Sequence, residues 1–298
     1  MRDALLPPPL ALGDRAAVLA PASPADPEAL RVGIGILSRR YRVDVLPSAS
    51  ASAGYLAGRD ETRAQDLQLA LDDPAVRAVI AVRGGFGTSR ILDSVSLDGL
   101  RRSPKWLVGS SDLTALALHV YGALGLCTIH GPMAAGLGRA DAADVDTLFT
   151  LLEGDGQDGR SLSPMVSGAA TGPLVGGNLT VMAHMVGSLP ADIFNGAILF
   201  LEDVGEKPYR LDRCLTQLMR SGLLRNLKGL VFGDFTDCAP NADGISAMDL
   251  MTAFAADLRI PAAFGYPAAH GPRNTPFVHG RLARLEVNAS EAMLHFDI

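Results

Sequence analysis

The feature that most constrains the fold is the alternation of short apolar segments with helical patterns through the first half of the chain. The clearest segment, residues 76–82, is apolar and rich in β-branched residues apart from Arg77, which is typical of a strand buried on both faces of a sheet. Similar strand patterns occur at 16–20, 42–46, 106–108 and 126–129, with helical patterns at 28–39, 60–71 and 113–125. Strands that alternate with helices predict a parallel sheet covered on both faces, so we expect an α/β domain of flavodoxin or Rossmann type.

The pattern changes between residues 154 and 172, where Gly, Ser, Asp and Pro give the composition of a linker. We therefore predict an N-terminal domain at 1–155, a linker at 156–172 and a C-terminal domain at 173–298. Helical patterns at 179–186 and 211–222 and strand patterns at 197–201, 229–233 and 282–287 follow less regularly. The second domain is predicted to be a smaller, irregular α/β domain rich in β-strands.

Charge and cysteine usage exclude several classes of function. The net charge of −6 and the pI of about 5.5 give no basic surface for a nucleic acid. Cys127, Cys214 and Cys238 are odd in number and far apart, which predicts buried thiols in a reducing compartment. The N-terminus carries an acid and a proline run, and no stretch reaches the roughly 18 apolar residues of a membrane span. We expect a cytoplasmic protein with no nucleic-acid or membrane partner.

Residues 108–114, Val-Gly-Ser-Ser-Asp-Leu-Thr, place two serines on a turn between an apolar strand and an apolar helix. A serine at such a corner can be held in strained backbone, with its hydroxyl exposed and nearby N–H groups directed at one point, as a nucleophile requires. Ser-Asp before a helix is also an ordinary N-cap. The motif alone favours capping, and the other segments have to decide between the two.

A glycine-rich turn, residues 83–90, follows the buried strand at 76–82. Gly84, Gly85 and Gly87 allow positive φ and a close approach of the backbone to a ligand. Their spacing lacks the G-x-G-x-x-G pattern, which disfavours a NAD-dependent dehydrogenase, and no Gly-Lys-Ser/Thr follows for a phosphate loop. Backbone N–H groups here could form part of an oxyanion hole, with a simple tight turn as the alternative.

Candidate acid and base residues lie in the second half. Glu202 comes directly after the apolar strand at 197–201, where α/β proteins present catalytic groups, and a Glu there can orient a histidine. Asp203 and Glu206 are better explained as solvated loop acids. Among six histidines, His270 in a Gly/Pro-rich loop is the first candidate base and His130 at a strand end is the second. No Cys/His/Asp cluster has ligand spacing, so we expect no metal, no cofactor and activity that survives chelators.

Taken in order along the chain, these segments resemble the LD-carboxypeptidase family of serine peptidases, which also contains the microcin-immunity hydrolases. The similar stretches are residues 20–23 (Ala-Pro-Ala-Ser), 56–63 (Leu-Ala-Gly-Arg-Asp-Glu-Thr-Arg), 83–87, 109–112, 130–133, 176–179, 201–206, 208–213 and the His270 loop. They span nearly the whole chain, and their joint occurrence is far more specific than any single stretch.

The resemblance implies a Ser-His-Glu triad at a site between the two domains, with Ser111 as nucleophile, Glu202 as acid and His270 as base. The N–H groups of Gly85 and Asp112 correspond to the oxyanion hole. The implied chemistry is acyl transfer through an acyl-enzyme. The implied substrate is a cytoplasmic muropeptide, which loses a terminal D-alanine next to the L-centre of meso-diaminopimelate or lysine, in peptidoglycan recycling.

The candidate substrate-binding residues are Arg83, Asn178 and Arg210. A guanidinium reads a terminal carboxylate through paired hydrogen bonds, although both arginines could instead make structural ion pairs. The expected partner is a small peptide, and the sequence leaves open whether the chain forms a homodimer.

Two positions depart from the family pattern. Ser110 stands where an aromatic residue is usual, and Ala268-Ala269 precede His270 where a glycine often stands; neither removes a catalytic group.

One alternative function is that of a microcin-immunity hydrolase of peptidyl- or aminoacyl-nucleotides, for which an aromatic residue that stacks on adenine is expected. The single tryptophan, Trp106, lies instead in a predicted strand. The other alternative is a non-catalytic small-molecule binding module.

Overall fold

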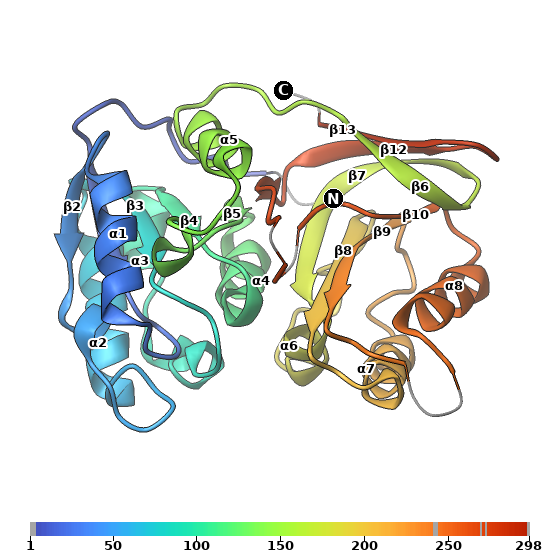
Figure 1. Cartoon of the computed structure of the whole chain (residues 1–298), viewed down its shortest axis with the longest axis horizontal. Helices are drawn as coiled ribbons and strands as arrows, with labels where there is room; N and C mark the ends of the chain where they lie inside the picture. The colour runs from blue at the N-terminus through green and yellow to red at the C-terminus, as the bar shows by residue number, and fades with distance from the viewer. Residues whose placement is uncertain (1–3, 241–243, 269, 272, 297–298) are drawn as a thin grey trace. The chain divides into compact units, whose positions relative to one another are not determined.

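The computed structural model describes residues 4–240, 244–268, 270–271 and 273–296, which divide into two compact units (Figure 1). One unit consists of Leu5–Asp155 with Thr275–Val278, and the other contains Gly156–Asn274 and the described residues from His279 onward. Among the described residues, no helix combines the length and the apolar character needed to cross a bilayer.

The first unit is built on a six-stranded sheet with the order β11-β5-β4-β3-β1-β2, in which β1 to β5 pair in parallel. Its strands are β1 (Arg15–Leu19), β2 (Arg42–Val45), β3 (Val76–Ala81), β4 (Trp106–Val108), β5 (Thr128–His130) and β11 (Phe277–His279). Its helices are α1 (Pro27–Leu37), α2 (Asp60–Asp72), α3 (Asp98–Arg102), α4 (Thr114–Leu124) and α5 (Ala142–Leu152). Short 3-10 turns connect them: η1 (Pro47–Ser50), η2 (Thr88–Arg90), η3 (Leu92–Ser94), η4 (Ser111–Leu113) and η5 (Ala134–Gly136).

Both faces of this sheet are covered by helices. Val18 and Ile80 share a buried cluster with Leu30 of α1 and Leu148 of α5. Because successive strand residues point to opposite faces, the neighbouring positions meet α2 and α4, and Leu19 lines a small internal cavity that Leu67 and Leu116 also line. The predicted parallel α/β domain is confirmed.

The parallel direction of the strands decides where loops meet. The carboxyl ends of parallel strands lie at one edge of a sheet, so the segments that follow β1, β3 and β4 are gathered there. These segments are the Pro21–Ser23 stretch, the glycine-rich turn and the serine corner, all singled out from the sequence.

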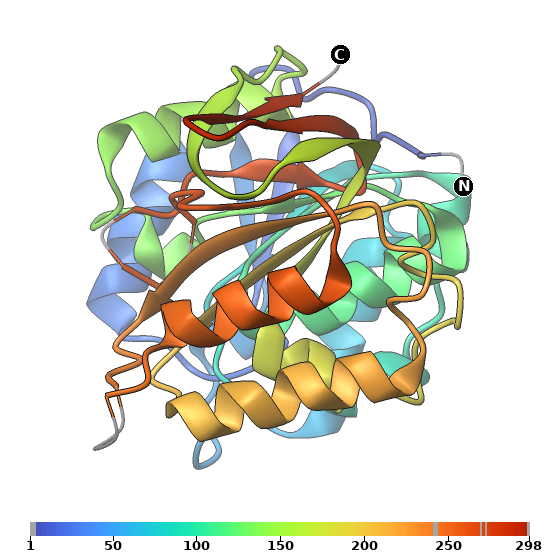
Figure 2. The ribbon, with the colours of Figure 1, turned by 90° about the vertical axis from the view of Figure 1, so that its right-hand side faces the viewer.

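The second unit is built on a closed barrel with the order β10-β6-β13-β12-β7-β8-β9. Its strands are β6 (Arg160–Val166), β7 (Gly168–Asn178), β8 (Ile198–Val204), β9 (Gly229–Thr236), β10 (Ala262–Phe264), β12 (Leu282–Val287) and β13 (Ala292–Phe296). Its helices are α6 (Leu179–His184), α7 (Pro208–Ser221) and α8 (Ala247–Leu258). β7 to β10 pair in parallel along the barrel wall and the other neighbours pair antiparallel. Figure 2 shows α7 and α8 side by side on the outside of this sheet.

The segment at 156–172, predicted as a linker, differs from that expectation. It carries β6 and the first part of β7, which are both barrel strands. Ser161, Ser163, Gly168 and Thr171 lie at exposed positions of these strands, so little hydrophobic alternation is left to reveal the strands. The irregular, β-rich α/β character expected of this half is confirmed, since three helices pack around a barrel of seven strands.

Candidate functional site

Ser111 has the strained backbone expected at a strand-to-helix corner. Its φ of +60° lies in the left-handed region, which residues with a Cβ atom rarely adopt. Ser111 begins the η4 turn between β4 and α4 and is partly exposed, whereas Ser110 is extended and buried. The corner therefore presents the hydroxyl of Ser111 and not that of Ser110.

The glycine-rich turn lies directly against this serine. A Cβ atom added at Gly84 would lie 2.7 Å from the Cβ and 2.9 Å from the Oγ of Ser111. The next residue, Gly85, has a φ of +104° and no room for a side chain, because a Cβ atom there would overlap Ser23. The backbone of the turn can thus approach the Ser111 hydroxyl as closely as it does only with glycine at these two positions.

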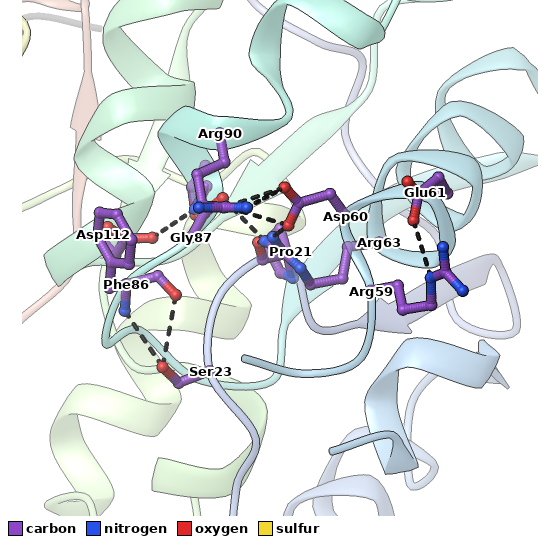
Figure 3. A network of polar contacts seen from close by, with 11 residues as sticks. Pro21, Ser23, Arg59, Asp60, Glu61, Arg63, Phe86, Gly87, Arg90 and Asp112 are labelled. Atoms are coloured by element: carbon purple, nitrogen blue, oxygen red, sulfur yellow. Dashed lines mark hydrogen bonds and ion pairs between the residues drawn. The ribbon is translucent and has the colours of Figure 1, made fainter. Parts of the chain in front are cut away.

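A buried arginine holds this turn in place (Figure 3). Arg63 of α2 is fully buried, and its Nη1 donates hydrogen bonds to the carbonyl of Pro21 and, at 2.8 Å, to that of Gly87. Its Nη2 pairs with the carboxylate of Asp60, which also binds Arg90 at 2.6 Å. A buried cation is tolerated when its charge is paired with a carboxylate and its terminal nitrogens are hydrogen-bonded, as they are here. Arg63 therefore joins the loop after β1 to the loop after β3.

Two further contacts complete the same network. The Oδ2 of Asp112 accepts the N–H of Thr88 at 2.8 Å, which joins the serine corner to the glycine-rich turn. Burial raises the pKa of Asp112, and the hydrogen bonds from Thr88 oppose that rise. On the other side, the Oγ of Ser23 accepts the N–H of Phe86 at 3.2 Å, as Figure 3 shows. The glycine-rich turn is thus bonded to both of the other loops at the carboxyl edge.

Arg63 belongs to the stretch 56–63 that resembles the family, but no role was expected for it. A signal was available, because Arg63 stands four residues before Leu67 and hence on the buried stripe of α2. A charged residue on an apolar stripe indicates a specific polar partner in the interior.

An acid–base pair lies in the second unit. The Nδ1 of His270, in the loop after β10, is 3.0 Å from the Oε2 of Glu202, which is completely buried. Glu202 was expected directly after a strand that ends at residue 201. In the structure β8 continues to Val204, so Glu202 lies inside the strand. A strand position fixes the carboxylate, while the His270 side chain on its loop keeps 25% of its surface exposed.

Burial and the hydrogen bond between Glu202 and His270 shift the pKa of each residue in opposite directions. Burial raises the pKa of Glu202, and the hydrogen bond and charge of His270 oppose the rise. For His270, burial alone would lower the pKa, but the hydrogen bond that His270 donates to Glu202 and the charge of that carboxylate outweigh burial, and the pKa is raised. The pair therefore favours a histidine that accepts a proton readily.

The neighbouring acids have other partners. Asp203, predicted to be a solvated loop acid, is buried and accepts hydrogen bonds from Asn178, from Val204 and from both the N–H and the hydroxyl of Thr180. That prediction is wrong because β8 extends past Asp203 and turns its side chain toward the start of α6. Glu206 pairs at 3.6 Å with Arg210.

The three candidate substrate-binding residues have different surroundings. Arg83 is exposed and donates to the carbonyl of Pro24 at 3.0 Å. Arg210 is exposed on α7, and its guanidinium lies 5.8 Å from the centre of the Tyr209 ring. Asn178 is buried, and its amide donates to Asp203 while its Oδ1 accepts the N–H of Val181 at the start of α6. These bonds give Asn178 a role within the fold.

The structure thus groups the sequence-predicted residues in two sets. Ser111, Gly85 and Asp112 lie together in the first unit, and Glu202 and His270 lie together in the second. His130, the second candidate base, is buried in the first unit and stacks on Phe277 with ring centres 5.0 Å apart.

Two further expectations concern Ala269 and metal binding. Ala269, one of the residues before His270 that depart from the family pattern, lies outside the described residues. Within the part of the chain that the structure describes, no three His, Cys, Asp or Glu side chains are grouped to hold a metal ion.

Comparison with known proteins matches both halves of the chain. The LD-carboxypeptidase N-terminal domain matches residues 16–131 and the LD-carboxypeptidase C-terminal domain matches residues 171–285. A putative carboxypeptidase of Streptomyces coelicolor is 37% identical over 297 residues, which cover 93% of this chain and 92% of that protein. The murein tetrapeptide carboxypeptidase of Pseudomonas aeruginosa is 36% identical over 259 residues, covering 78% of this chain and 80% of that protein.

Solved structures agree with these matches. The muramoyltetrapeptide carboxypeptidase from Oxalobacter formigenes superposes with a TM-score of 0.82 at 31% identity, covering 94% of this chain and 99% of that one. The microcin C7 self-immunity protein MccF, in complex with aspartyl sulfamoyl adenosine, gives a TM-score of 0.86 at 20% identity, covering 98% and 99%. The second likeness shows a shared fold alone. The resemblance inferred from the sequence is confirmed: this chain belongs to the LD-carboxypeptidase family and is a serine-type hydrolase.

Proposed function

We propose that this enzyme removes the terminal D-alanine from a murein tetrapeptide, with Ser111, His270 and Glu202 as a catalytic triad. The observation that carries the proposal is the left-handed backbone of Ser111 at the β4–α4 corner, against the glycine-rich turn. The Glu202–His270 hydrogen bond supports it, because it is the orienting contact that a triad needs.

The chemistry follows from these groups. His270 uses Nδ1 to bond Glu202, so Nε2 is the nitrogen that takes the proton from Ser111 as the hydroxyl attacks the amide carbonyl. The N–H groups of Gly85 and Asp112 bind the resulting oxyanion. His270 then donates its proton to the amine of the leaving D-alanine, and an acyl-enzyme remains on Ser111. Water, activated by the same imidazole, hydrolyses this ester.

The substrate class is supported by the relatives, since the proteins from Pseudomonas aeruginosa and Oxalobacter formigenes carry the names of murein tetrapeptide carboxypeptidases. The test is mass spectrometry of a murein tetrapeptide incubated with the purified enzyme. We expect the tetrapeptide to lose its terminal alanine, which gives a tripeptide and free D-alanine. An intact tetrapeptide after prolonged incubation would contradict the proposal. This function also implies the cytoplasmic location expected from the sequence.

The alternative substrate is an acylated nucleotide of the kind that microcin-immunity hydrolases cleave. The likeness to MccF concerns the fold, whereas the Pseudomonas aeruginosa relative, which has higher identity, is named for the cleavage of a murein tetrapeptide. Trp106 lies buried in β4, so it offers no ring for stacking on a base. Faster cleavage of a peptidyl-adenosine conjugate than of the tetrapeptide would favour the alternative.

Gly84→Ala is expected to lower kcat by about 10²-fold, because its methyl group would displace Ser111 from its attacking position. Gly84 has no positive φ, so the effect would be steric and not a backbone conflict. The measurement is the initial rate of alanine release. Gly35→Ala is the matched control, since a Cβ atom there meets nothing within 4 Å. Equal rates for the two variants would contradict the close approach of the turn to Ser111.

A tetrapeptide amide is expected to react about 10- to 100-fold more slowly than the free acid, because a carboxypeptidase must recognise the charged chain end. We propose Arg83 and Arg210 as the residues that bind this carboxylate. The measurement is kcat/KM for the acid and the amide with the wild type, Arg83→Met and Arg210→Met. The responsible arginine is the one whose loss removes the difference between the two peptides. Equal rates for acid and amide in the wild type would rule out carboxylate anchoring.

A further inference from the structure

The peptide unit between Gly84 and Gly85 carries one of the proposed oxyanion donors, and its two glycines give it little resistance of its own to turning over. Glycine has no Cβ atom and reaches both signs of φ at little cost, so a unit between two glycines rotates readily. A turned unit would present the carbonyl oxygen of Gly84 in place of the N–H of Gly85, and this oxygen would repel an oxyanion. An oxyanion hole built on this unit therefore needs a restraint on its direction.

Ser23, in the loop after β1, makes a bond on each side of Gly85. Its backbone N–H donates to the carbonyl of Gly84 at 3.2 Å, and its Oγ accepts the N–H of Phe86 at 3.2 Å. The same hydroxyl donates to the carbonyl of Phe86 at 3.5 Å, and Figure 3 shows both contacts with Phe86. Ser23 thus holds both peptide units that meet at the Cα of Gly85, where φ is +104°.

The bond to Gly84 sets the direction of the Gly85 N–H. The carbonyl and the N–H of a trans peptide unit point in opposite directions, and the carbonyl of Gly84 points at the N–H of Ser23. The N–H of Gly85 therefore points away from Ser23. The turn that carries it lies against the nucleophile, because a Cβ atom added at Gly84 would be 2.9 Å from the Oγ of Ser111.

Ser23 is itself held firmly by its neighbours. Its side chain is buried, and the loop that carries it is bonded to other segments of the first unit. The carbonyl of Pro21 accepts a hydrogen bond from Arg63, and the carbonyl of Ala22 accepts the N–H of Ala57 at 2.9 Å. A side chain supported in this way has a fixed position before a substrate arrives.

We propose that Ser23 is a positioning residue, which keeps the N–H of Gly85 directed at the oxyanion. The proposal rests on the proposed function, because that function makes Gly85 an oxyanion donor. Ser23 acts through Gly85 and needs no contact with the substrate. A donor that is already oriented in the free enzyme costs no reorganisation when negative charge develops in the transition state.

Ser23→Ala removes the bonds to Phe86 and keeps the backbone bond to Gly84, so Gly85 regains part of its rotational freedom. We expect kcat for alanine release to fall by about 10- to 100-fold, less than the roughly 10²- to 10³-fold that loss of a whole oxyanion donor costs. KM should change by less than about 2-fold, because the oxyanion exists only in the transition state. A peptidyl boronate, which forms a tetrahedral adduct with the serine, should bind more weakly by the factor that kcat/KM loses.

Ser48→Ala is the matched control. Ser48 is also buried, and its Oγ also accepts a backbone N–H of the loop after β1, that of Ala20 at 3.1 Å. The two variants should therefore lose similar thermal stability. Ser48→Ala should nevertheless keep the kcat and the boronate affinity of the wild type, because its hydroxyl does not bond the glycine-rich turn.

An unchanged kcat in Ser23→Ala, or equal losses in the two variants, would overturn the proposal and leave the proposed function intact. A rise in KM without a fall in kcat would overturn it as well. If the wild type releases no alanine, the proposed function fails. The restraint is then tested on acylation of the enzyme by p-nitrophenyl acetate. Slower acylation in Ser23→Ala than in Ser48→Ala supports the restraint, and equal or absent acylation overturns it.

Discussion

Ser111→Ala is expected to lower kcat for alanine release by at least about 10⁴-fold, while Ser110→Ala keeps most of the activity. The left-handed backbone at Ser111 presents its hydroxyl beside the Gly84 backbone, whereas Ser110 is extended and buried. Without the hydroxyl no acyl-enzyme forms, and only binding and the oxyanion donors continue to act. The measurement is single-turnover alanine release at saturating enzyme.

The two serine variants control for each other, since each removes one hydroxyl from the same turn. Thermal unfolding should show both to be folded, and Ser111→Ala is expected to be no less stable than the wild type. The strain at φ +60° belongs to the backbone and persists with alanine, so a gain in stability is not required. Reversed kinetic effects would mean that Ser110 is the nucleophile.

Glu202→Gln is expected to lower kcat by about 10³- to 10⁴-fold, because a neutral amide neither stabilises the imidazolium nor fixes the tautomer with its proton on Nδ1. Glu206→Gln is the matched control, since Glu206 is four residues further along and pairs with Arg210. A loss with Glu206→Gln as large as that with Glu202→Gln would contradict the assignment of the triad acid.

The pH profile tests the same pair independently. Glu202 raises the pKa of His270 above its ordinary value of 6.5 in spite of burial. A general base works in its neutral form, so kcat/KM in the wild type should fall as the pH drops through this raised pKa. In Glu202→Gln the two largest causes of the raised pKa of His270 are gone, while burial and the smaller effect of the Asp203 charge remain, so the acidic limb should move to lower pH. If the acidic limb of the kcat/KM profile does not move in Glu202→Gln, a group other than His270 controls that limb.

The sequence predicts the first unit well because its signals are local. Most residues of β1, β3 and β4 are apolar, and each strand is followed by a helical pattern or a turn signal, so the direction and order of these strands follow from the chain alone. α5 was not predicted, and neither was α8 in the other unit. Helix α8 begins with a capping box formed by Ser246 and Asp249, a signal that was present in the sequence.

The barrel was predictable in character but not in detail. β10 and β13 are short, and their places are set by pairing with β6, which is far from both along the chain. Such register depends on long-range contacts that leave no local pattern. The same limit applies to the site: the Ser111 corner follows from neighbouring residues, whereas the buried partners of Arg63 and Asp203 come from distant loops.

The edge strand β11 ties the completion of the first sheet to the order of protein synthesis. It pairs with β5 but is synthesised after five of the seven barrel strands, so a ribosome releases the other five strands of the first sheet long before it. Thr275 then bonds the buried Asp144 at 2.7 Å, and Phe277 stacks on His130. Until that moment the β5 edge has unpaired backbone groups that invite pairing with another chain. A fragment that stops at Asp155 keeps this open edge permanently, so the edge of the first sheet is closed only after residues 277–279 have been synthesised.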